Sequence, residues 1–376
     1  MPEHTDESAM IVETARRFAA ERLAPHAAAR EVAGRIEPEI VRELGELGFL
    51  GATTAAEWGG AEIDYATYAA VIEEIAAGDG AVSTLVSVHN APTVEILERF
   101  GTAAQKDRWL RPLATGTALG SFALTEAEAG SDAAAIRTRA RRSNSGYVVD
   151  GSKQFITNAS IGQVTLLFAV TDPAAGKRGI SCFVVGNDTP GFSIARVEHK
   201  LGQKASDSCA LAFDAMAVAE DQRIGAEGEG YRIALSTLES GRIGIAAQSI
   251  GMARAALDYA IGYAKEREAF GQKIIAHQAV AFRLVEAKTQ LAAARALTAH
   301  AAALKDAKQP ALEAAAMAKL FASEAAEAVC SAAIQTLGGY GYLADYPVER
   351  IWRDVRVCQI YEGTSDVQKI ILSRML

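Results

Sequence analysis

Hydrophobic residues recur at helical spacing through the first third of the chain. Between residues 65 and 75 they lie three and four positions apart, which predicts a helix with one apolar face. The positions concerned are Tyr65, Tyr68, Ile72 and Ile75. Asp64 can cap the start of this helix and Gly78 can end it, while Pro38 and Gly48 bound a second predicted helix in the same way.

The pattern changes near residue 119 and stays different until about residue 228. Short runs of apolar and β-branched residues here predict strands, and the last run alternates with period two. The runs are 147–149, 165–170, 180–185 and 193–197. Asp150-Gly151 is a hairpin-type turn signal. Because the strands follow one another without helices between them, they predict an antiparallel sheet or barrel rather than a βαβ unit.

Helical spacing returns from Tyr231 onward. One long apolar stripe comprises Leu284, Ala287, Leu291, Ala294, Leu297, Ala301 and Leu304. Pro310 opens a further helix that is expected to run to about Leu337, and long helices with such stripes predict a four-helix bundle. The chain is therefore expected to be α+β and multidomain. We expect an N-terminal helical domain at 1–118, a central β domain at 119–228 and a C-terminal bundle at 229–376.

Composition excludes several other classes of protein. The 376-residue chain has a net charge of −8, which argues against a nucleic-acid partner. Its four cysteines are far apart in sequence and are expected to be buried, reduced thiols of a cytoplasmic protein. The polar N-terminus suggests no secretory leader, and no apolar run is long enough to cross a membrane. The six histidines form no HExxH pair, so no metal site is expected, and residues 225–230 do not match GxGxxG.

Two segments of the β region have residues suited to a planar ligand. Residues 123–132 combine small residues with hydroxyls and can approach a ring closely. In 153–158, Phe155 and Thr157 are two positions apart and would lie on one side of a strand, where they could stack on a ring and bond its edge. Taken alone, the first segment is better explained as a polar turn and the second as an ordinary cross-strand core pair.

Two segments of the C-terminal region could hold a diphosphate. Arg267 is followed by a glycine turn, and a guanidinium there could bind two phosphate oxygens. The same arginine could simply compensate the end of a helix. Residues 335–342 contain paired glycines, which either let the backbone lie against a ligand or end a helix.

Glu362 lies in the sequence Tyr361-Glu362-Gly363-Thr364, where a carboxylate on a short turn could be buried and aimed as a general base. Arg242 lies at the edge of the apolar stretch 243–250, and a buried arginine needs an anion. Glu362 is one candidate for that anion. Nearby acidic residues of the same helix, Glu239 and Asp258, are local alternatives.

Taken together and in this order, these segments resemble the acyl-CoA dehydrogenase family over nearly the whole chain, from about Met10 to the end. One matching signature is Leu124-Thr125-Glu126 followed by Gly130-Ser131-Asp132. The other comprises Gln335, Gly338-Gly339, Gly341, Asp345, Arg350 and Asp354. The family fold, with a helical N-terminal domain, a central β domain and a C-terminal four-helix bundle, agrees with the order expected from the residue pattern.

The resemblance implies FAD as cofactor and a role for each matching residue. Glu362 would be the catalytic base, and Ser131, Arg242 and Gly363 would contact the substrate. Residues that would contact the flavin or close over it are Phe122, Leu124, Thr125, Phe155, Thr157, Thr364 and Gln368. Those that would hold the adenine–diphosphate half are Arg267, Phe270 and Gln278, with Gln335, Gly338 and Gly339, the last group from a neighbouring subunit.

The implied reaction is dehydrogenation of an acyl-CoA to a trans-2-enoyl-CoA. In this family the backbone N–H of the base and a flavin hydroxyl bind the thioester oxygen, and the flavin accepts a hydride. Electrons would pass to an electron-transferring flavoprotein, and the protein would be a homotetramer acting in fatty-acid β-oxidation. We expect a short or medium acyl chain. An oxidase-like flavoenzyme that uses oxygen and a catalytically silent relative are the alternatives.

The chain departs from the family pattern at three places. Ala127-Glu128 stand where Pro-Gly is usual, which could alter the rigidity of the loop. Phe155 stands where tryptophan is usual, so the flavin keeps an aromatic cover but the electron-transfer contact is in doubt. Some relatives carry the base on the helix just before the arginine, and that position is Gly241 here. Glu239 is the weaker alternative base.

Overall fold

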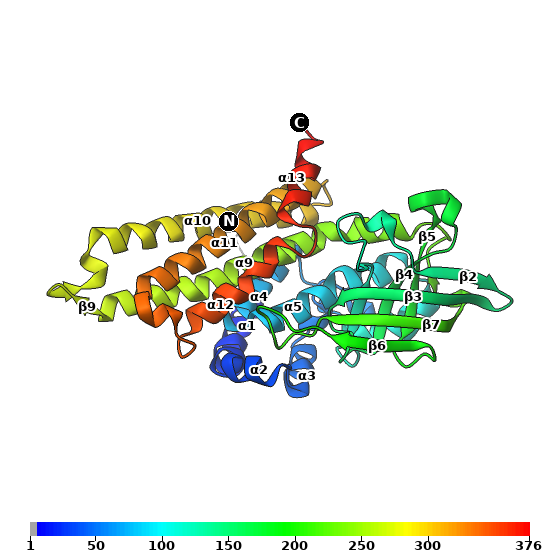
Figure 1. Ribbon diagram of the computed structural model, residues 1–376, viewed down its shortest axis with the longest axis horizontal. Coiled ribbons are helices and arrows are strands. Elements are labelled where there is room, and N and C mark those ends of the chain that lie inside the picture. Colours follow the sequence, from blue (N-terminus) through cyan, green and yellow to red (C-terminus); the bar gives the residue numbers. More distant parts are fainter. Residues whose placement is uncertain (1–5) are drawn as a thin grey trace.

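The computed structural model describes residues 6–376, in which a helical region and a sheet are joined to a bundle of long helices (Figure 1). This confirms the predicted α–β–α order and the fold class. The α-helices of the first region are α1 (Asp6–Phe18), α2 (Ala27–Ala33), α3 (Pro38–Glu46), α4 (Tyr65–Gly78), α5 (Gly80–Val88), α6 (Glu95–Phe100), α7 (Ala103–Gln105) and α8 (Arg111–Ala114). The expectation of no leader falls partly on residues 1–5, which lie outside this range.

The two predicted N-terminal helices are α3 and α4, with the expected ends. The Asp64 carboxylate accepts a hydrogen bond from the Thr67 backbone N–H at 2.6 Å, which caps α4 at its first turn. Pro38 opens α3, and Gly48 follows its end with φ of 75°. Local capping chemistry therefore sets the boundaries of these helices.

The central region is one twisted sheet with helices packed against it (Figure 1). Its strands are β1 (Gly120–Ala123), β2 (Arg139–Ser143), β3 (Gly146–Ile156), β4 (Val164–Val170), β5 (Ile180–Gly186), β6 (Phe192–Val197), β7 (Cys209–Ala219) and β8 (Arg223–Ile224). Their order is β6-β7-β3-β2-β4-β5-β8, with β1 beside β4. Most pairs are antiparallel as predicted, but β4 runs parallel to both β1 and β2, so the sheet is mixed.

The predicted turn at Asp150-Gly151 is wrong, because β3 continues through it. The register against β7 shifts between Val149 and Gly151, so these residues form a bulge. Gly151 has φ of 146°, and a Cβ there would lie 2.6 Å from the Thr138 hydroxyl, so the site needs glycine. The hairpin turn between β2 and β3 lies instead at residues 144–145.

The C-terminal region contains three long helices along the long axis of the molecule (Figure 1). Its elements are α9 (Gly230–Glu266), β9 (Glu268–Ala269), β10 (Gln272–Lys273), α10 (Gln278–Asp306), α11 (Leu312–Leu337), α12 (Pro347–Val355) and α13 (Ser365–Ser373). The shorter α12 packs on both α9 and α11 and takes the fourth place of the bundle. The predicted stripe faces inward from α10, and α11 begins two residues after Pro310.

One continuous apolar core joins the N-terminal helices to the bundle, with α4 packed on α9 and α10. The predicted domain limits at 118 and 228 therefore stay a prediction. The four cysteines are buried free thiols. Among residues 6–376, no helix combines the length and apolarity needed to cross a bilayer.

Candidate active site

Glu362 lies in a tight loop between the one-turn helix Arg356–Gln359 and α13. Its φ is 54° and that of Gly363 is 86°, so two successive residues are left-handed. Such a backbone costs an L-residue roughly 1–2 kcal/mol, so contacts elsewhere must stabilise this conformation. Thr364 ends the loop by capping α13, with its hydroxyl accepting from the Val367 backbone N–H at 3.2 Å.

Two buried side chains hold the carbonyls of this loop. The Lys319 ammonium on α11 donates to the Gly363 carbonyl at 2.7 Å, and the Gln368 amide donates to it at 2.9 Å and to the Glu362 carbonyl at 3.3 Å. Both side chains are fully buried. Burial lowers the pKa of Lys319 to about 8. These contacts fix the backbone of Glu362 and leave its carboxylate free.

The Glu362 carboxylate is poised for proton transfer. Its Oε2 atom is buried without a hydrogen-bond partner in the described chain, and its backbone N–H donates to no acceptor there. Burial raises the pKa of Glu362 to about 7, although the nearby charges of Arg242 and Lys319 act in the opposite direction. A carboxyl that titrates near neutrality and faces no partner can take a proton from a ligand.

Arg242 on α9 is also buried and incompletely paired. Only 4% of it is exposed, and its Nε and one terminal nitrogen have no partner among residues 6–376. Burial lowers its pKa, and Glu362 opposes this more strongly than Glu239 does. The predicted proximity of Arg242 to Glu362 is thus observed, without a direct ion pair. Unpaired donors in so dry a place suit a polar ligand.

Gly241 explains how α9 approaches the base. A Cβ built on Gly241 would lie 2.8 Å from the Oε2 atom of Glu362. Position 241 and position 362 therefore face the same small volume, and only one of them can carry a carboxylate in this conformation.

The β1 end of the sheet presents the first group of predicted flavin contacts. Phe122 is half-buried against Phe168, with ring centroids 4.9 Å apart, and the Leu124 side chain is buried. The buried Lys153 ammonium donates to the Leu124 carbonyl at 2.9 Å and the Gln154 N–H donates to the Thr125 carbonyl at 2.9 Å. The segment at Leu124 and Thr125, just after β1, is therefore held firmly against β3.

Phe155 and Thr157 do not share a strand face as predicted. The register against β7 shifts between Lys153 and Ile156, Phe155 has φ of 61°, and Thr157 lies in the turn beyond β3. The bulge breaks the period-two alternation on which the prediction relied. It leaves Phe155 62% exposed, so the aromatic ring is available to cover a ligand.

The predicted diphosphate residues surround the far end of α9. Arg267 directly follows that helix, and Phe270 lies at the turn between β9 and β10 with φ of 53° and an exposed fraction of 95%. An open cavity of about 350 Å³ is lined by Arg267, Gly338 and Gly339 of the same chain. A Cβ on either glycine would meet nothing within 4 Å, so the backbone there can approach a ligand. Gln278 and Gln335 are exposed nearby in sequence.

The two groups of predicted cofactor residues are far apart within one chain. Gly230, the first residue of α9, packs on Ser181 of β5, and Arg267 follows the last turn. A helix of 37 residues is about 55 Å long. Figure 1 shows the sheet at one end of the molecule and β9 at the other. Arg267 lines one cavity with Gly338 and Gly339 of the same chain, an arrangement that does not favour the expected division with only 335–339 from a neighbour; that division stays a prediction.

The remaining predicted contacts have mixed positions. Ser131 is exposed on the loop between β1 and the turn at Ala133–Ala135. The Gln368 amide nitrogen is used by the loop carbonyls, while its Oε1 atom is buried and unpaired. The sequence reasoning missed Lys319. A lysine between Ala315, Ala318 and Ala322 on an apolar helix face was the available signal, the same one that singled out Arg242.

Family models match the chain in three consecutive parts. They are the acyl-CoA dehydrogenase N-terminal domain at residues 5–117, its middle domain at 121–216 and its C-terminal domain at 228–376. The fold and the site thus define a flavin-dependent oxidoreductase built around one buried carboxylate. The chain belongs to the acyl-CoA dehydrogenase family, and the predicted enzyme class and FAD cofactor are confirmed.

Known proteins resemble the chain along its whole length. An acyl-CoA dehydrogenase of Bacillus subtilis (strain 168) is 42% identical, with 99% of this chain and 98% of that protein covered. A short-chain-specific acyl-CoA dehydrogenase of Clostridium acetobutylicum is 40% identical, with 98% and 97% covered.

Solved structures agree with these sequence relatives. Butyryl-CoA dehydrogenase from Megasphaera elsdenii has a TM-score of 0.97 at 38% identity, with 99% and 98% of the chains covered. A chain in a structure described as electron transferring flavoprotein of Acidaminococcus fermentans has a TM-score of 0.98 at 40% identity, with 100% and 99% covered. An FAD complex of PigA has a TM-score of 0.95 at 30% identity, with 99% and 98% covered.

Proposed function

We propose that this enzyme removes the α-proton and a β-hydride from a short-chain acyl-CoA thioester, giving the trans-2-enoyl-CoA. The observation that carries the proposal is the Oε2 atom of the Glu362 carboxylate, which is buried and without a partner among residues 6–376, on a backbone held by Lys319 and Gln368. Its pKa of about 7 leaves a substantial ionised fraction at neutral pH and makes it a stronger base than an exposed glutamate. The names of the short-chain and butyryl-CoA relatives favour a short acyl chain.

The groups around Glu362 would position the thioester. The free backbone N–H of Glu362 can donate to the thioester oxygen and stabilise the negative charge that develops as the α-proton leaves. Arg242 would contribute positive charge at the same end of the site. Gly363 would lie close to the substrate. Its carbonyl would not compete for the thioester, because it already accepts a hydrogen bond from Lys319. Ser131 would meet the CoA portion at the mouth of the site.

The residues of the chain fit FAD, which when bound would accept the hydride. The exposed Phe155 ring would cover the flavin, with Thr157, Phe122, Leu124 and Thr125 around it. Arg267 and Phe270, with the open backbone at Gly338 and Gly339, would hold the diphosphate and adenine. Gln278 and Gln335 would assist there, and Thr364 and Gln368 would lie over the flavin end.

Gly241, which faces Glu362, and Arg267 are 26 residues apart (267 − 241) along α9 and its end, about 39 Å, so the two groups are remote within one chain. Each FAD would therefore lie between two copies of the chain, with the β domain of one and Arg267 of the other. Such sharing requires at least a pair of subunits, which supports the expected homotetramer to that extent. We also propose a cytoplasmic enzyme of β-oxidation that passes electrons to an electron-transferring flavoprotein, the protein named for one structural neighbour.

The proposal is tested by mixing the oxidised enzyme without oxygen with acyl-CoA thioesters of increasing chain length. Loss of flavin absorbance is expected to be fastest with a four-carbon substrate. Fastest bleaching with long chains would overturn the substrate assignment, and no bleaching with any acyl-CoA would overturn the reaction. The oxidase-like alternative requires the reduced enzyme to regain its colour rapidly in air, whereas a dehydrogenase needs an electron-transferring flavoprotein.

A further inference from the structure

A chain of buried hydrogen bonds leads away from the residue before the base. The Tyr361 hydroxyl donates to the Gln248 amide oxygen at 2.7 Å, and the Gln248 amide nitrogen donates to the Thr84 hydroxyl at 2.5 Å. The Thr84 hydroxyl donates to the Gln203 amide oxygen at 2.5 Å. The backbone and side-chain nitrogens of Gln203 then donate to Asp354, the latter to its carbonyl at 3.1 Å.

The members of this polar chain come from separate parts of the fold. Thr84 is on α5, Gln248 on α9 and Asp354 on α12, while Gln203 lies between β6 and β7. Gln248 is fully buried, and Thr84 and Gln203 are 3% and 4% exposed. Both amide hydrogens of Gln248 are used, since it also donates to the Gly80 carbonyl at 3.1 Å. A polar chain satisfied in this way is rigid and specifies one arrangement of its elements.

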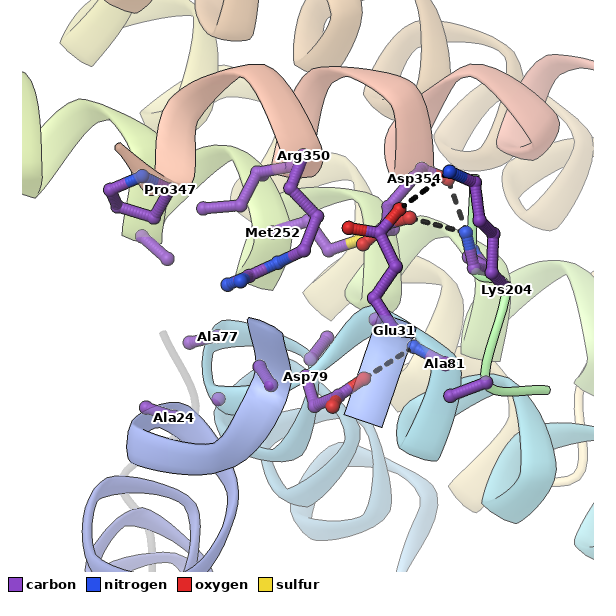
Figure 2. A pocket seen from close by; sticks show the side chains of 18 of the residues that line it. Ala24, Glu31, Ala77, Asp79, Ala81, Lys204, Met252, Pro347, Arg350 and Asp354 are labelled. Atoms are coloured by element: carbon purple, nitrogen blue, oxygen red, sulfur yellow. Dashed lines mark hydrogen bonds and ion pairs between the residues drawn. The ribbon is translucent and has the colours of Figure 1, made fainter. Parts of the chain in front are cut away.

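The polar chain ends beside a second cavity of about 230 Å³. Figure 2 shows Asp354 on one side of this cavity and Asp79 on the other, with Glu31 and Lys204 close to Asp354. Arg30 pairs with Asp79 at 2.6 Å, and Lys204 pairs with Glu31 at 3.2 Å. Asp354 is only 7% exposed. The far end of the polar chain is therefore a buried carboxylate close to other charged residues.

The polar chain can influence Glu362 because the Oε2 atom of its carboxylate has no hydrogen-bond partner among residues 6–376. Its position is set by its backbone, which is left-handed at φ of 54°. Lys319 and Gln368 hold that backbone at Gly363 and at the Glu362 carbonyl, and the Tyr361 side chain anchors it from the preceding residue.

We propose that Tyr361 and Thr84 are positioning residues that, through the Gln248 hydrogen bonds, fix the backbone of Glu362 and so aim its carboxylate. The proposal rests on the proposed role of Glu362 as the base. Neither side chain needs to touch the reacting atoms. Thr84 belongs to a helix of the N-terminal region, so its effect on proton abstraction would travel through this polar chain.

The test compares four variants under saturating FAD. Tyr361→Phe removes one hydroxyl, Thr84→Val breaks the polar chain with a side chain of similar shape, and Thr84→Ser keeps its hydroxyl. Tyr147→Phe is the matched control. This buried tyrosine of β3 donates a hydrogen bond to Glu227 and lies outside the polar chain. The readouts are the anaerobic rate of flavin bleaching, the isotope effect with an α-deuterated acyl-CoA, FAD content and thermal stability.

Tyr361→Phe and Thr84→Val are each expected to slow bleaching by about tenfold, near the upper end of one hydrogen bond's net contribution, and to raise the α-deuterium isotope effect. Thr84→Ser is expected to restore both, and Tyr147→Phe to change neither. A merely structural role would lower FAD content or thermal stability without changing the isotope effect.

Bleaching within about twofold of the wild-type rate in Tyr361→Phe would overturn the inference, since one net hydrogen bond would then have no effect. A Thr84→Ser variant as slow as Thr84→Val would overturn it as well. If Thr84→Val fails to fold, Tyr361→Phe decides alone. Failure of the base assignment is distinguished by Glu362→Gln: an active Glu362→Gln enzyme overturns the proposed function, whereas an inactive one with a normal Tyr361→Phe overturns only the positioning role.

Discussion

The loop of Glu362 and the end of α9 near Arg267 are prepared for ligands in opposite ways. The loop is held by Lys319 and Gln368 within one chain, and the Oε2 atom of its carboxylate is shielded from water. At the other end, Phe270 is 95% exposed and Arg267 lines an open cavity. In the proposed function, one chain would build the proton-transfer half of the site alone, whereas the diphosphate half would be completed by another copy of the chain.

Glu362→Gln removes the proposed base and should give the largest effect. The amide keeps the size of the side chain, so FAD binding should persist while bleaching by substrate slows by about 10³- to 10⁴-fold. Anaerobic stopped-flow absorbance measures this rate. Glu239→Gln is the matched control and should remain near wild type; the reverse result would move the base to Glu239 and leave the Glu362 loop without a role in proton transfer.

Arg267→Ala should weaken FAD binding at the end of α9 without altering the Glu362 site. Loss of a charge-assisted contact to a diphosphate is expected to raise the dissociation constant for FAD by about ten- to a hundredfold. Flavin fluorescence during titration of the apoenzyme measures this constant. At saturating FAD the bleaching rate should recover, because Glu362 is untouched.

Lys265→Ala, on an exposed position at the same end of α9, is the control for Arg267→Ala and should bind FAD normally. Equal weakening in both variants would mean that general charge, not a specific contact, holds the diphosphate.

Lys319→Met tests the role of the Glu362 loop through the pH dependence of kcat/KM. The Lys319 charge lowers the pKa of Glu362, so its removal should raise that pKa above about 7 and shift the rise of kcat/KM to higher pH. Activity at pH 7 should fall by about tenfold as the Gly363 carbonyl also loses its donor. Lys369→Met, an exposed lysine paired with Glu324, should leave the profile in place.

The smallest effect concerns stability. Because burial raises the folded-state pKa of Glu362 to about 7, the folded chain binds this proton more tightly than the unfolded chain. Wild type should therefore lose stability, relative to Glu362→Gln, as pH rises from about 5 to about 8. Thermal unfolding of both proteins across this range measures the difference, and a difference independent of pH would contradict the raised pKa.

Sequence patterns predicted the elements whose boundaries are set locally. Asp64, Pro38 and the stripe on α10 gave helices that the structure contains. Glu362 and Arg242 were also singled out, because a charged residue in an apolar setting is visible in sequence. The bulges at Gly151 and Phe155 were missed because they depend on the register against β7. The separation of Arg267 from the β domain depends on the whole length of α9, which no local pattern reports.

The close approach of Gly241 to Glu362 constrains how a base could migrate between two positions during divergence. A carboxylate at either position fills the volume that the other would need. An ancestor that exchanged one for the other would pass through a chain with two carboxylates or with none. Two carboxylates crowded into this volume would disfavour each other's ionisation, and a site with neither lacks a base. Such an exchange would therefore proceed most readily as a paired replacement of positions 241 and 362.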